Sequence, residues 1–216
     1  MTSLAPVSGS SLRTLFRLKY AGWCVLLVMA LAVLFIVDLP MLNAHHPARP
    51  YFFKVRWSLL PHIIFGGIAI LSGPVQFSSR VRRQYPQFHR ILGRFYVGSI
   101  MIAAPMGIVI PLVGPKDPFF TTGVIVHGSL WFVTTLMAFL TARNRHILQH
   151  KQWMVRSYIL TFSFVITRVL SPLWPIFHVS ITQYGMIDVI LNVLYLLVAD
   201  IALNWREIST RRACST

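Results

Sequence analysis

Long apolar segments separated by short basic loops constrain this chain more than any other feature of its sequence. The first segment covers residues 20–38, and five more follow at about 57–77, 95–114, 119–141, 153–170 and 185–205. A helix needs roughly 20 apolar residues to cross a bilayer, and lipid-exposed backbone must be hydrogen-bonded internally. The pattern therefore predicts an all-α, polytopic membrane protein with six transmembrane helices.

The distribution of charge gives this topology an orientation. Charged residues make up 12% of the chain, and the net charge is +15. Fifteen of the 20 Lys and Arg residues lie in four regions of the sequence. These are the part before the first segment, the loops after the second and fourth segments with their borders, and the part after the last segment. Because Lys and Arg collect in cytoplasmic loops, both termini are expected in the cytoplasm. This pattern argues against a nucleic-acid ligand and favours anionic lipid headgroups as partners of the basic loops.

The domain organisation follows from these segments. We expect a cytoplasmic tail over residues 1–19, one six-helix domain over 20–205 and a second tail over 206–216. The first segment has a rival interpretation as a cleaved signal peptide. An uncleaved helix is favoured because the segment is long and ends in Asp38-Leu-Pro rather than at small residues.

The segment from His150 to Arg168 concentrates polar groups within apolar sequence. At 100° per residue, His150, Ser157, Thr161 and Arg168 fall on one helical face. A polar face within lipid must contact protein or water. This face is therefore expected to point into the helix bundle.

Charged residues within the apolar segments are expected to pair. Arg168 and Asp188 lie at similar depth, so we predict an Arg168–Asp188 pair, because an unpaired charge there is costly. Asp200 is expected to meet Arg156 or a loop arginine. The Arg168–Asp188 pair is either a structural bridge or a site where Arg168 holds an anionic substrate or a haem propionate.

Four histidines lie at two depths in the predicted bundle. His62 and His127 are near the outer ends of the second and fourth segments, while His89 and His150 precede the third and fifth at the inner edge. Bis-histidine haem ligation requires one imidazole from each of two facing helices, together with small residues. Possible haem b binding at these histidines is one hypothesis. The alternative is ordinary hydrogen-bonded residues near a membrane interface.

Other chemistry finds little support in the sequence. His146 and His150 are four residues apart, but no carboxylate or cysteine nearby completes a zinc site, so no metal site is expected. The chain has no P-loop, dinucleotide glycine fingerprint or nucleophile elbow. These residues leave open whether the protein is an enzyme.

Two motifs resemble a known family. The first is G-P-V-Q-F over residues 73–77 followed by H-R-x-x-G-R-x-Y from His89. The second is H-x-x-W-M-x-R-S-Y from His150. Together they resemble DUF2306, a domain-of-unknown-function family of predicted multi-span membrane proteins, over about residues 57–200. The resemblance implies a membrane protein and brings no activity with it. His62, His89 and His150 match its pattern, and His127 does not. The pairing of the histidines also resembles the architecture of cytochrome b561.

Three functions remain open from the sequence. The leading hypothesis is electron transfer at the histidines of helices two to five, either through haem b or by reaction with a quinone. The partner would be a quinone or another redox partner. The second is a small-molecule or lipid transporter or binding protein, with Gln76 and Arg168 lining a polar cavity. The third is a membrane assembly or scaffold protein.

Overall fold

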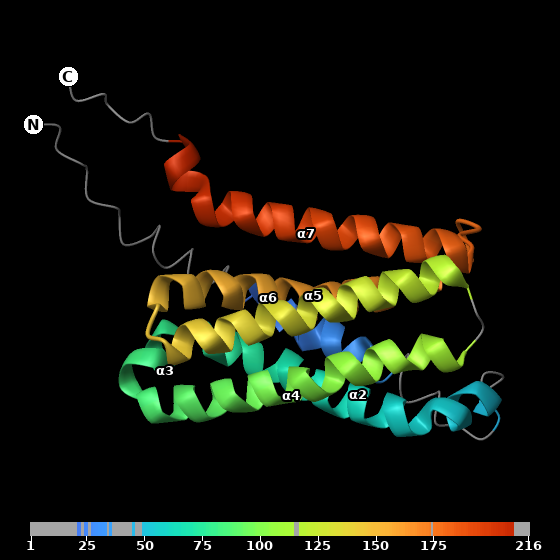
Figure 1. Cartoon of the computed structure of the whole chain (residues 1–216), viewed down its shortest axis with the longest axis horizontal. Coiled ribbons are helices and arrows are strands. Elements are labelled where there is room, and N and C mark those ends of the chain that lie inside the picture. Colours follow the sequence, from blue (N-terminus) through green and yellow to red (C-terminus); the bar gives the residue numbers. More distant parts are fainter. Residues whose placement is uncertain are drawn as a thin grey trace, which may run out of the picture.

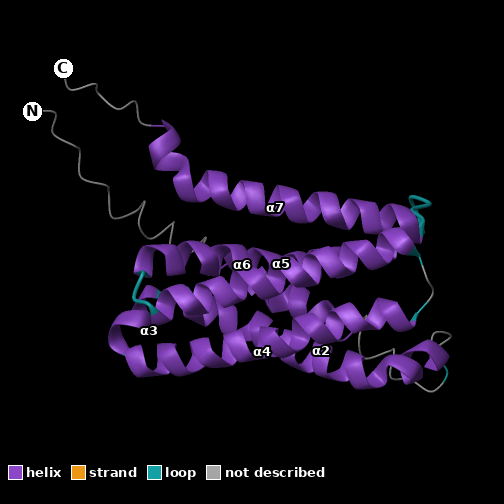
Figure 2. Cartoon of the chain, viewed as in Figure 1, coloured by secondary structure: helices purple, strands orange, loops and turns teal. Residues whose placement is uncertain are grey.

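The computed structural model describes residues 21–22, 24–25, 27–33, 35, 45, 49–114, 117–173 and 175–209. These residues form helices and connecting turns, and no strand occurs among them (Figure 2). The described residues between 21 and 35 are helical. The remaining helices are α2 (Arg49–Gln76), α3 (Ser79–Gln84), α4 (Pro86–Val113), α5 (Pro118–Arg143), α6 (Ile147–Leu170), the 3₁₀ helix η3 (Ser171–Leu173) and α7 (Ile181–Ser209).

Five of these helices are long and apolar enough to cross a membrane, which confirms a multi-pass membrane protein. They correspond to the second to sixth predicted segments. The first predicted span and both predicted tails lie wholly or partly outside the described residues. The count of six and the orientation of the termini therefore stay predictions.

Several helix starts differ from those expected from hydropathy. Helix α2 begins at Arg49 rather than near residue 57, and α4 begins at Pro86 rather than near residue 95. The segments interpreted as a basic loop are therefore mostly helical, and His89 and His150 lie on helices rather than before them. The reason is that a helix continues past the apolar part of its sequence. Long arginine side chains at its end extend outward to polar surroundings.

Helices α2, α4, α5 and α6 form a four-helix bundle (Figure 1). Helix α2 packs mainly on α4, α4 on α5, and α5 on α6, while α6 closes the ring against α2. Helix α7 lies outside the bundle along α5 and α6. The bundle interior is therefore lined by four helices, and α7 covers one side of it.

Helix α2 contains Pro74, which changes how it packs on α6. Proline has no N–H, so the carbonyl of Ile70, four residues earlier, loses its usual helical partner. The Tyr158 hydroxyl donates a hydrogen bond to that carbonyl at 3.3 Å. A Cβ atom on Gly73 would lie 1.9 Å from the Tyr158 ring. Glycine at this position thus lets the Tyr158 ring reach the α2 backbone.

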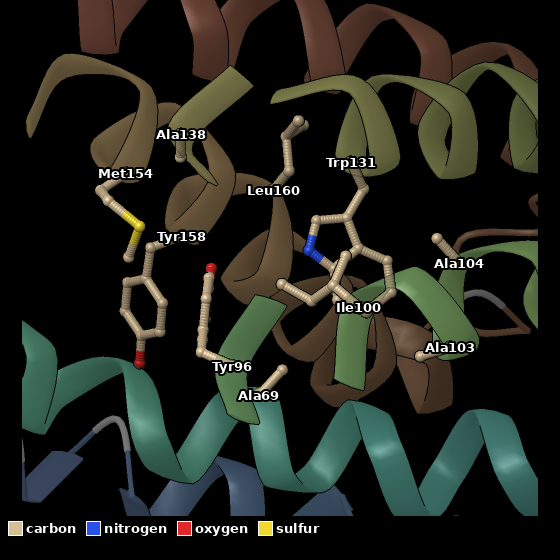
Figure 3. Close-up of a cluster of buried hydrophobic side chains, with 10 residues drawn as sticks. All are labelled: Ala69, Tyr96, Ile100, Ala103, Ala104, Trp131, Ala138, Met154, Tyr158 and Leu160. Atoms are coloured by element: carbon tan, nitrogen blue, oxygen red, sulfur yellow. The ribbon is translucent and has the colours of Figure 1, made fainter. Parts of the chain in front are cut away.

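The centre of the bundle combines an apolar core with a buried set of hydrogen-bonded side chains. Tyr96, Trp131 and Tyr158 project into the space among the helices (Figure 3). The Tyr96 hydroxyl lies 2.9 Å from Ser157 Oγ and 3.1 Å from Thr161 Oγ1. Thr135 Oγ1 is 2.7 Å from Ser157 Oγ, and Trp131 Nε1 donates to Thr161 Oγ1 at 2.8 Å. Each of these polar groups has a partner, which is what burial requires.

Candidate functional site

The two ends of the bundle differ in charge. The end that carries α3 and the α5–α6 turn, here called the basic end, has exposed Arg and Lys side chains at positions 80, 82, 83, 90, 94, 143, 145 and 151. The opposite end, here called the far end, carries the α4–α5 connection and η3. Each end contains one pair of the four histidines.

At the basic end, His89 of α4 and His150 of α6 line the same two adjoining cavities, of about 480 Å³ and about 500 Å³. Ligand cavities for small molecules and cofactors are typically about 300–1,000 Å³. Small residues (Gly93, Ala138, Ala142) and arginines (Arg90, Arg94, Arg143) line the first cavity together with Gln76. This space is large, cationic and bounded by two imidazoles.

Hydrogen bonds orient the basic-end histidines. His150 Nδ1 lies 2.8 Å from the carbonyl oxygen of Ala138. A carbonyl can only accept, so Nδ1 carries the proton and Nε2 keeps its lone pair when the ring is neutral. His89 Nδ1 is buried without a hydrogen-bond partner among the described residues. Gln76 Nε2 donates to the His89 carbonyl at 3.2 Å, which ties α2 to the first turn of α4.

At the far end, His62 of α2 and His127 of α5 also share two cavities. These cavities are much smaller, about 80 Å³ and about 110 Å³. The two cavities have five lining residues in common, which are His62, His127, Trp131, Phe164 and Arg168. They are therefore two parts of one chamber, here called the far-end chamber.

Both far-end imidazoles are held through Nδ1. His62 Nδ1 donates to the Ala103 carbonyl at 2.8 Å, and His127 Nδ1 lies 2.7 Å from Asn192 Oδ1. Asn192 Nδ2 in turn donates to Asp188 Oδ2 at 3.1 Å. A carboxylate accepts hydrogen bonds, so Asp188 fixes which end of the Asn192 amide faces His127, and that end is the oxygen. In the neutral ring, each Nε2 is consequently an acceptor.

Three polar side chains converge on the Phe164 ring in this chamber. The ring centroid of Phe164 is 5.4 Å from that of His62 and 6.5 Å from that of His127. The Arg168 guanidinium carbon lies 5.0 Å from the Phe164 centroid. A phenyl ring offers no conventional hydrogen bond to the imidazoles that surround it. The ring therefore lies beside both imidazoles and the guanidinium.

A carboxylate outside the spanning helices joins α5 to α7 at the far end. Asp117 accepts a hydrogen bond from the Phe120 N–H at 2.8 Å and so caps the start of α5. Its second oxygen accepts one from the Thr182 hydroxyl of α7. The Phe120 N–H, followed by the Thr182 hydroxyl, holds the pKa of Asp117 below its ordinary value.

The structure distributes the predicted polar residues over different sites. Arg156 and Asp200 form an ion pair at 2.6 Å, one of the two pairings expected for Asp200. Arg168 and Asp188 line the same far-end cavity, and Asp188 accepts a hydrogen bond from Asn192. The Arg168–Asp188 pair stays a prediction. Gln76 lines the basic-end cavity and Arg168 lines the far-end chamber, so the polar cavity expected to contain both residues stays a prediction.

Asn192 and Phe164 were not predicted from the sequence as residues of a site. Asn192 is 1% exposed and lies four residues after Asp188, so one helix turn joins them. A buried polar residue one turn from an intramembrane carboxylate was the available signal. Phe164 carried no such signal, because a phenylalanine in an apolar helix has no distinguishing sequence context. Within the described part of the chain, no group of three His, Cys, Asp or Glu side chains is arranged to hold a metal ion.

The DUF2306 family, described as a predicted membrane protein, matches residues 59–203. The chain belongs to this family. The match runs from α2 into α7 and includes all four histidines of the two sites. The motifs at His89 and His150 are thus parts of a DUF2306 domain that folds as a helical membrane bundle. No curated protein and no solved structure matches the chain.

Proposed function

We propose that this protein transfers electrons in the membrane through a haem b bound at the basic end by His89 and His150. One observation carries the proposal. Two histidines from different helices line a cavity of about 480 Å³ that also has arginine and glycine in its wall. A bis-histidine haem b site would use one imidazole from each of two helices, room for a flat macrocycle and cations beside its two propionates.

The donor set of this cavity fits such a group. The hydrogen bond from His150 Nδ1 to the Ala138 carbonyl leaves Nε2 as the ligating atom. This is the arrangement that iron-ligating and zinc-ligating histidines usually have, with the second ring nitrogen fixed by a carbonyl. His89 Nδ1 is buried without a hydrogen-bond partner among the described residues, so no hydrogen bond fixes that ring through Nδ1 as one fixes His150. Gly93, Ala138 and Ala142 leave space between the helices.

The arginines have a separate role in this proposal. Arg90, Arg94 and Arg143 line the cavity where it approaches the basic end. They would bind the propionates, because guanidinium groups pair with carboxylates in a two-point geometry. The positive charge would also favour the more electron-rich state of whatever the cavity holds. When bound, haem b supplies a one-electron couple. A quinone or a protein partner would exchange the electron with it.

The far end does not offer the same fit. Its histidines form a similar pair, but cavities of about 80 Å³ and about 110 Å³ leave too little room for a macrocycle. The proposal is therefore for one haem at the basic end, and no step is assigned to a second haem at His62 and His127.

A reduced-minus-oxidised absorption spectrum of the purified full chain tests the proposal. We expect a haem b band after expression with sufficient haem, and its loss in His89→Ala and in His150→Ala. His146→Ala is the matched control, since His146 is exposed one turn before His150 and makes no side-chain cap. A folded chain without a haem band, under conditions that load a control cytochrome, would overturn the proposal. A band that survives both substitutions would also overturn it.

A further inference from the structure

We infer that the far-end chamber binds the ring of an aromatic diol, of which a membrane quinol is the form that the surroundings favour. The inference deepens the proposed electron-transfer function and rests on it for the choice of a redox-active ring. Binding itself requires no haem. Nothing in the resemblance to DUF2306 assigns a ligand to this chamber.

The shape of the ligand follows from Phe164. Its phenyl ring packs against both imidazoles and lines both parts of the chamber. A single six-membered ring is therefore the size of group that the polar side chains surround here. If Phe164 turns away, the two cavities of about 80 Å³ and about 110 Å³ join through the volume that its ring now fills. That combined space suits one ring and is too small for a tetrapyrrole.

The polarity of the ligand follows from the two histidines. The carbonyl of Ala103 and the amide oxygen of Asn192 each take the Nδ1 proton of one ring. Both neutral imidazoles therefore present an acceptor, Nε2, and neither makes a further hydrogen bond to a described residue. Two acceptors in one chamber select a ligand with two donors. A quinol has two O–H groups, whereas the oxidised quinone has two carbonyls and only accepts.

The hydrogen bond between Asn192 and Asp188 maintains this selectivity by fixing the orientation of the Asn192 amide. Rotation of the Asn192 amide would present its NH₂ group to His127 and would break the 3.1 Å hydrogen bond to Asp188. The carboxylate thus holds His127 in the acceptor tautomer, as second partners of functional histidines commonly do. Asp188 and Arg168 both line the chamber, so its walls carry opposite charges that offset each other. The site therefore favours a neutral diol over a carboxylate.

The position of the chamber indicates where the ligand enters. Leu31 and Leu71 line its first part and are 39% and 52% exposed on the surface of the helices. In a spanning protein this surface meets lipid tails. A membrane-dissolved quinol reaches the chamber directly from the bilayer, and its apolar tail remains in lipid. A water-soluble diol lacks that contribution.

Thermal stabilisation of the purified full chain in detergent, measured under anaerobic conditions, tests the inference. The probes are decylubiquinol, decylubiquinone, the di-O-methyl ether of the quinol, and the same quinol ring without its tail. We expect the tailed quinol to stabilise most, and the methyl ether, which has no O–H donor, to stabilise least. His62→Leu and His127→Leu should each weaken quinol binding roughly three- to tenfold, the equivalent of one lost hydrogen bond.

Two further variants examine Phe164. Phe164→Ala should strengthen quinol binding, because the competing ring is gone. Phe162→Ala is the control, since Phe162 lies on the same helix and lines neither part of the chamber. Equal stabilisation by the quinol and its methyl ether would overturn the inference, as would no stabilisation by any probe. If the tailless ring binds as well as the tailed quinol, the assignment to a membrane quinol is wrong.

The outcomes separate this inference from the proposed function. Quinol binding without a haem band would leave the chamber as assigned and overturn the basic-end haem. A haem band with no quinol binding would leave the basic-end haem as proposed and overturn the assignment of the far-end chamber.

Discussion

The two ends of the bundle hold the same pair of residue types in different surroundings. At the basic end, two histidines border about 480 Å³ of space, together with three arginines. At the far end, two histidines share about 110 Å³ or less with one arginine, one aspartate and a phenylalanine ring. Three of the four histidines, His62, His127 and His150, are alike in that Nδ1 is hydrogen-bonded to an oxygen.

This difference shows that a histidine pair does not by itself specify a ligand. The volume between the helices and the charge at its rim distinguish a site for a large dianionic cofactor from a site for one neutral ring. The Tyr96 hydroxyl (Figure 3) is hydrogen-bonded to the hydroxyls of Ser157 and Thr161, and Thr161 also lines the far-end chamber. Because each of these hydroxyls has a partner, the group holds α4 and α6 together between the two ends of the bundle.

Gly73→Ala is expected to have the largest effect, because it displaces Tyr158, a residue of the bundle core. The added Cβ would lie 1.9 Å from Tyr158, so the ring must move and its bond to the Ile70 carbonyl is lost. Overpacking of this kind costs about 1–3 kcal/mol. The measurement is the free energy of unfolding in mixed detergent, together with haem content and quinol binding, and all three should fall.

Gly98→Ala is the matched control for that substitution. Gly98 is exposed within α4, and a Cβ there would meet nothing within 4 Å. Alanine in a helix interior is more stable than glycine by about 0.5–1 kcal/mol. The same chemical change should therefore stabilise at one position and destabilise at the other. If both variants behave alike, the close approach of Tyr158 to α2 is wrong.

Gly107→Ala should damage the far end and spare the basic end. A Cβ on Gly107 would lie 2.8 Å from two atoms of the His62 ring. The ring must turn, and the hydrogen bond from His62 Nδ1 to Ala103 is lost at a cost of about 1 kcal/mol. The affinity for the quinol should weaken roughly tenfold, while the haem spectrum stays unchanged.

Gly93→Ala provides the comparison at the basic end. A Cβ on Gly93 would lie 3.4 Å from Gln76 Oε1, an ordinary contact, and would project from the wall of the large cavity. This variant should leave quinol binding unchanged and lower haem content. A loss of haem in Gly107→Ala would show instead that the two sites are coupled.

The sequence predicted the helical membrane fold because hydropathy reports directly on burial in lipid. It also predicted that His89 and His150, and His62 and His127, occupy two levels, since depth follows from position along a helix. It did not predict the sizes of the two cavities, which depend on the angles between helices and on lining residues such as Gly93 and Gly107. Phe164 illustrates the same limit, because only the assembled bundle shows which polar groups surround it.

Helix starts were missed for a related reason. Hydropathy marks where apolar sequence begins, whereas a helix ends where its backbone hydrogen bonds end. Arg49, Lys54 and Arg56 are polar and yet helical, and the guanidinium carbon of Arg56 lies 3.8 Å from the centroid of the Phe53 ring. Such arginines are compatible with a helix that extends beyond the bilayer core.

The smallest expected effect concerns Asp117, which joins α5 to α7 beside the far end. Its hydrogen bonds with the Phe120 N–H and the Thr182 hydroxyl lower the pKa of the folded carboxyl below its ordinary value of about 3.9. A lowered folded-state pKa means that this carboxylate stabilises the fold fully above the unfolded pKa. The contribution is lost as the pH falls through the folded pKa. Acidification below about pH 4 should therefore loosen the α5–α7 contact.

Asp117→Asn should show less change in melting temperature than the wild type between pH 6 and pH 3, because asparagine does not titrate. Quinol binding should likewise change less with pH in Asp117→Asn than in the wild type, since α7 supplies Asn192 and Asp188 to the far-end chamber. Haem content should show the same pH dependence in both proteins, because α7 contributes no residue to the basic-end cavities. Parallel pH profiles for the two proteins would show that the Asp117 hydrogen bonds do not hold α7 in place. The far-end chamber would then depend on packing between α5 and α7 alone.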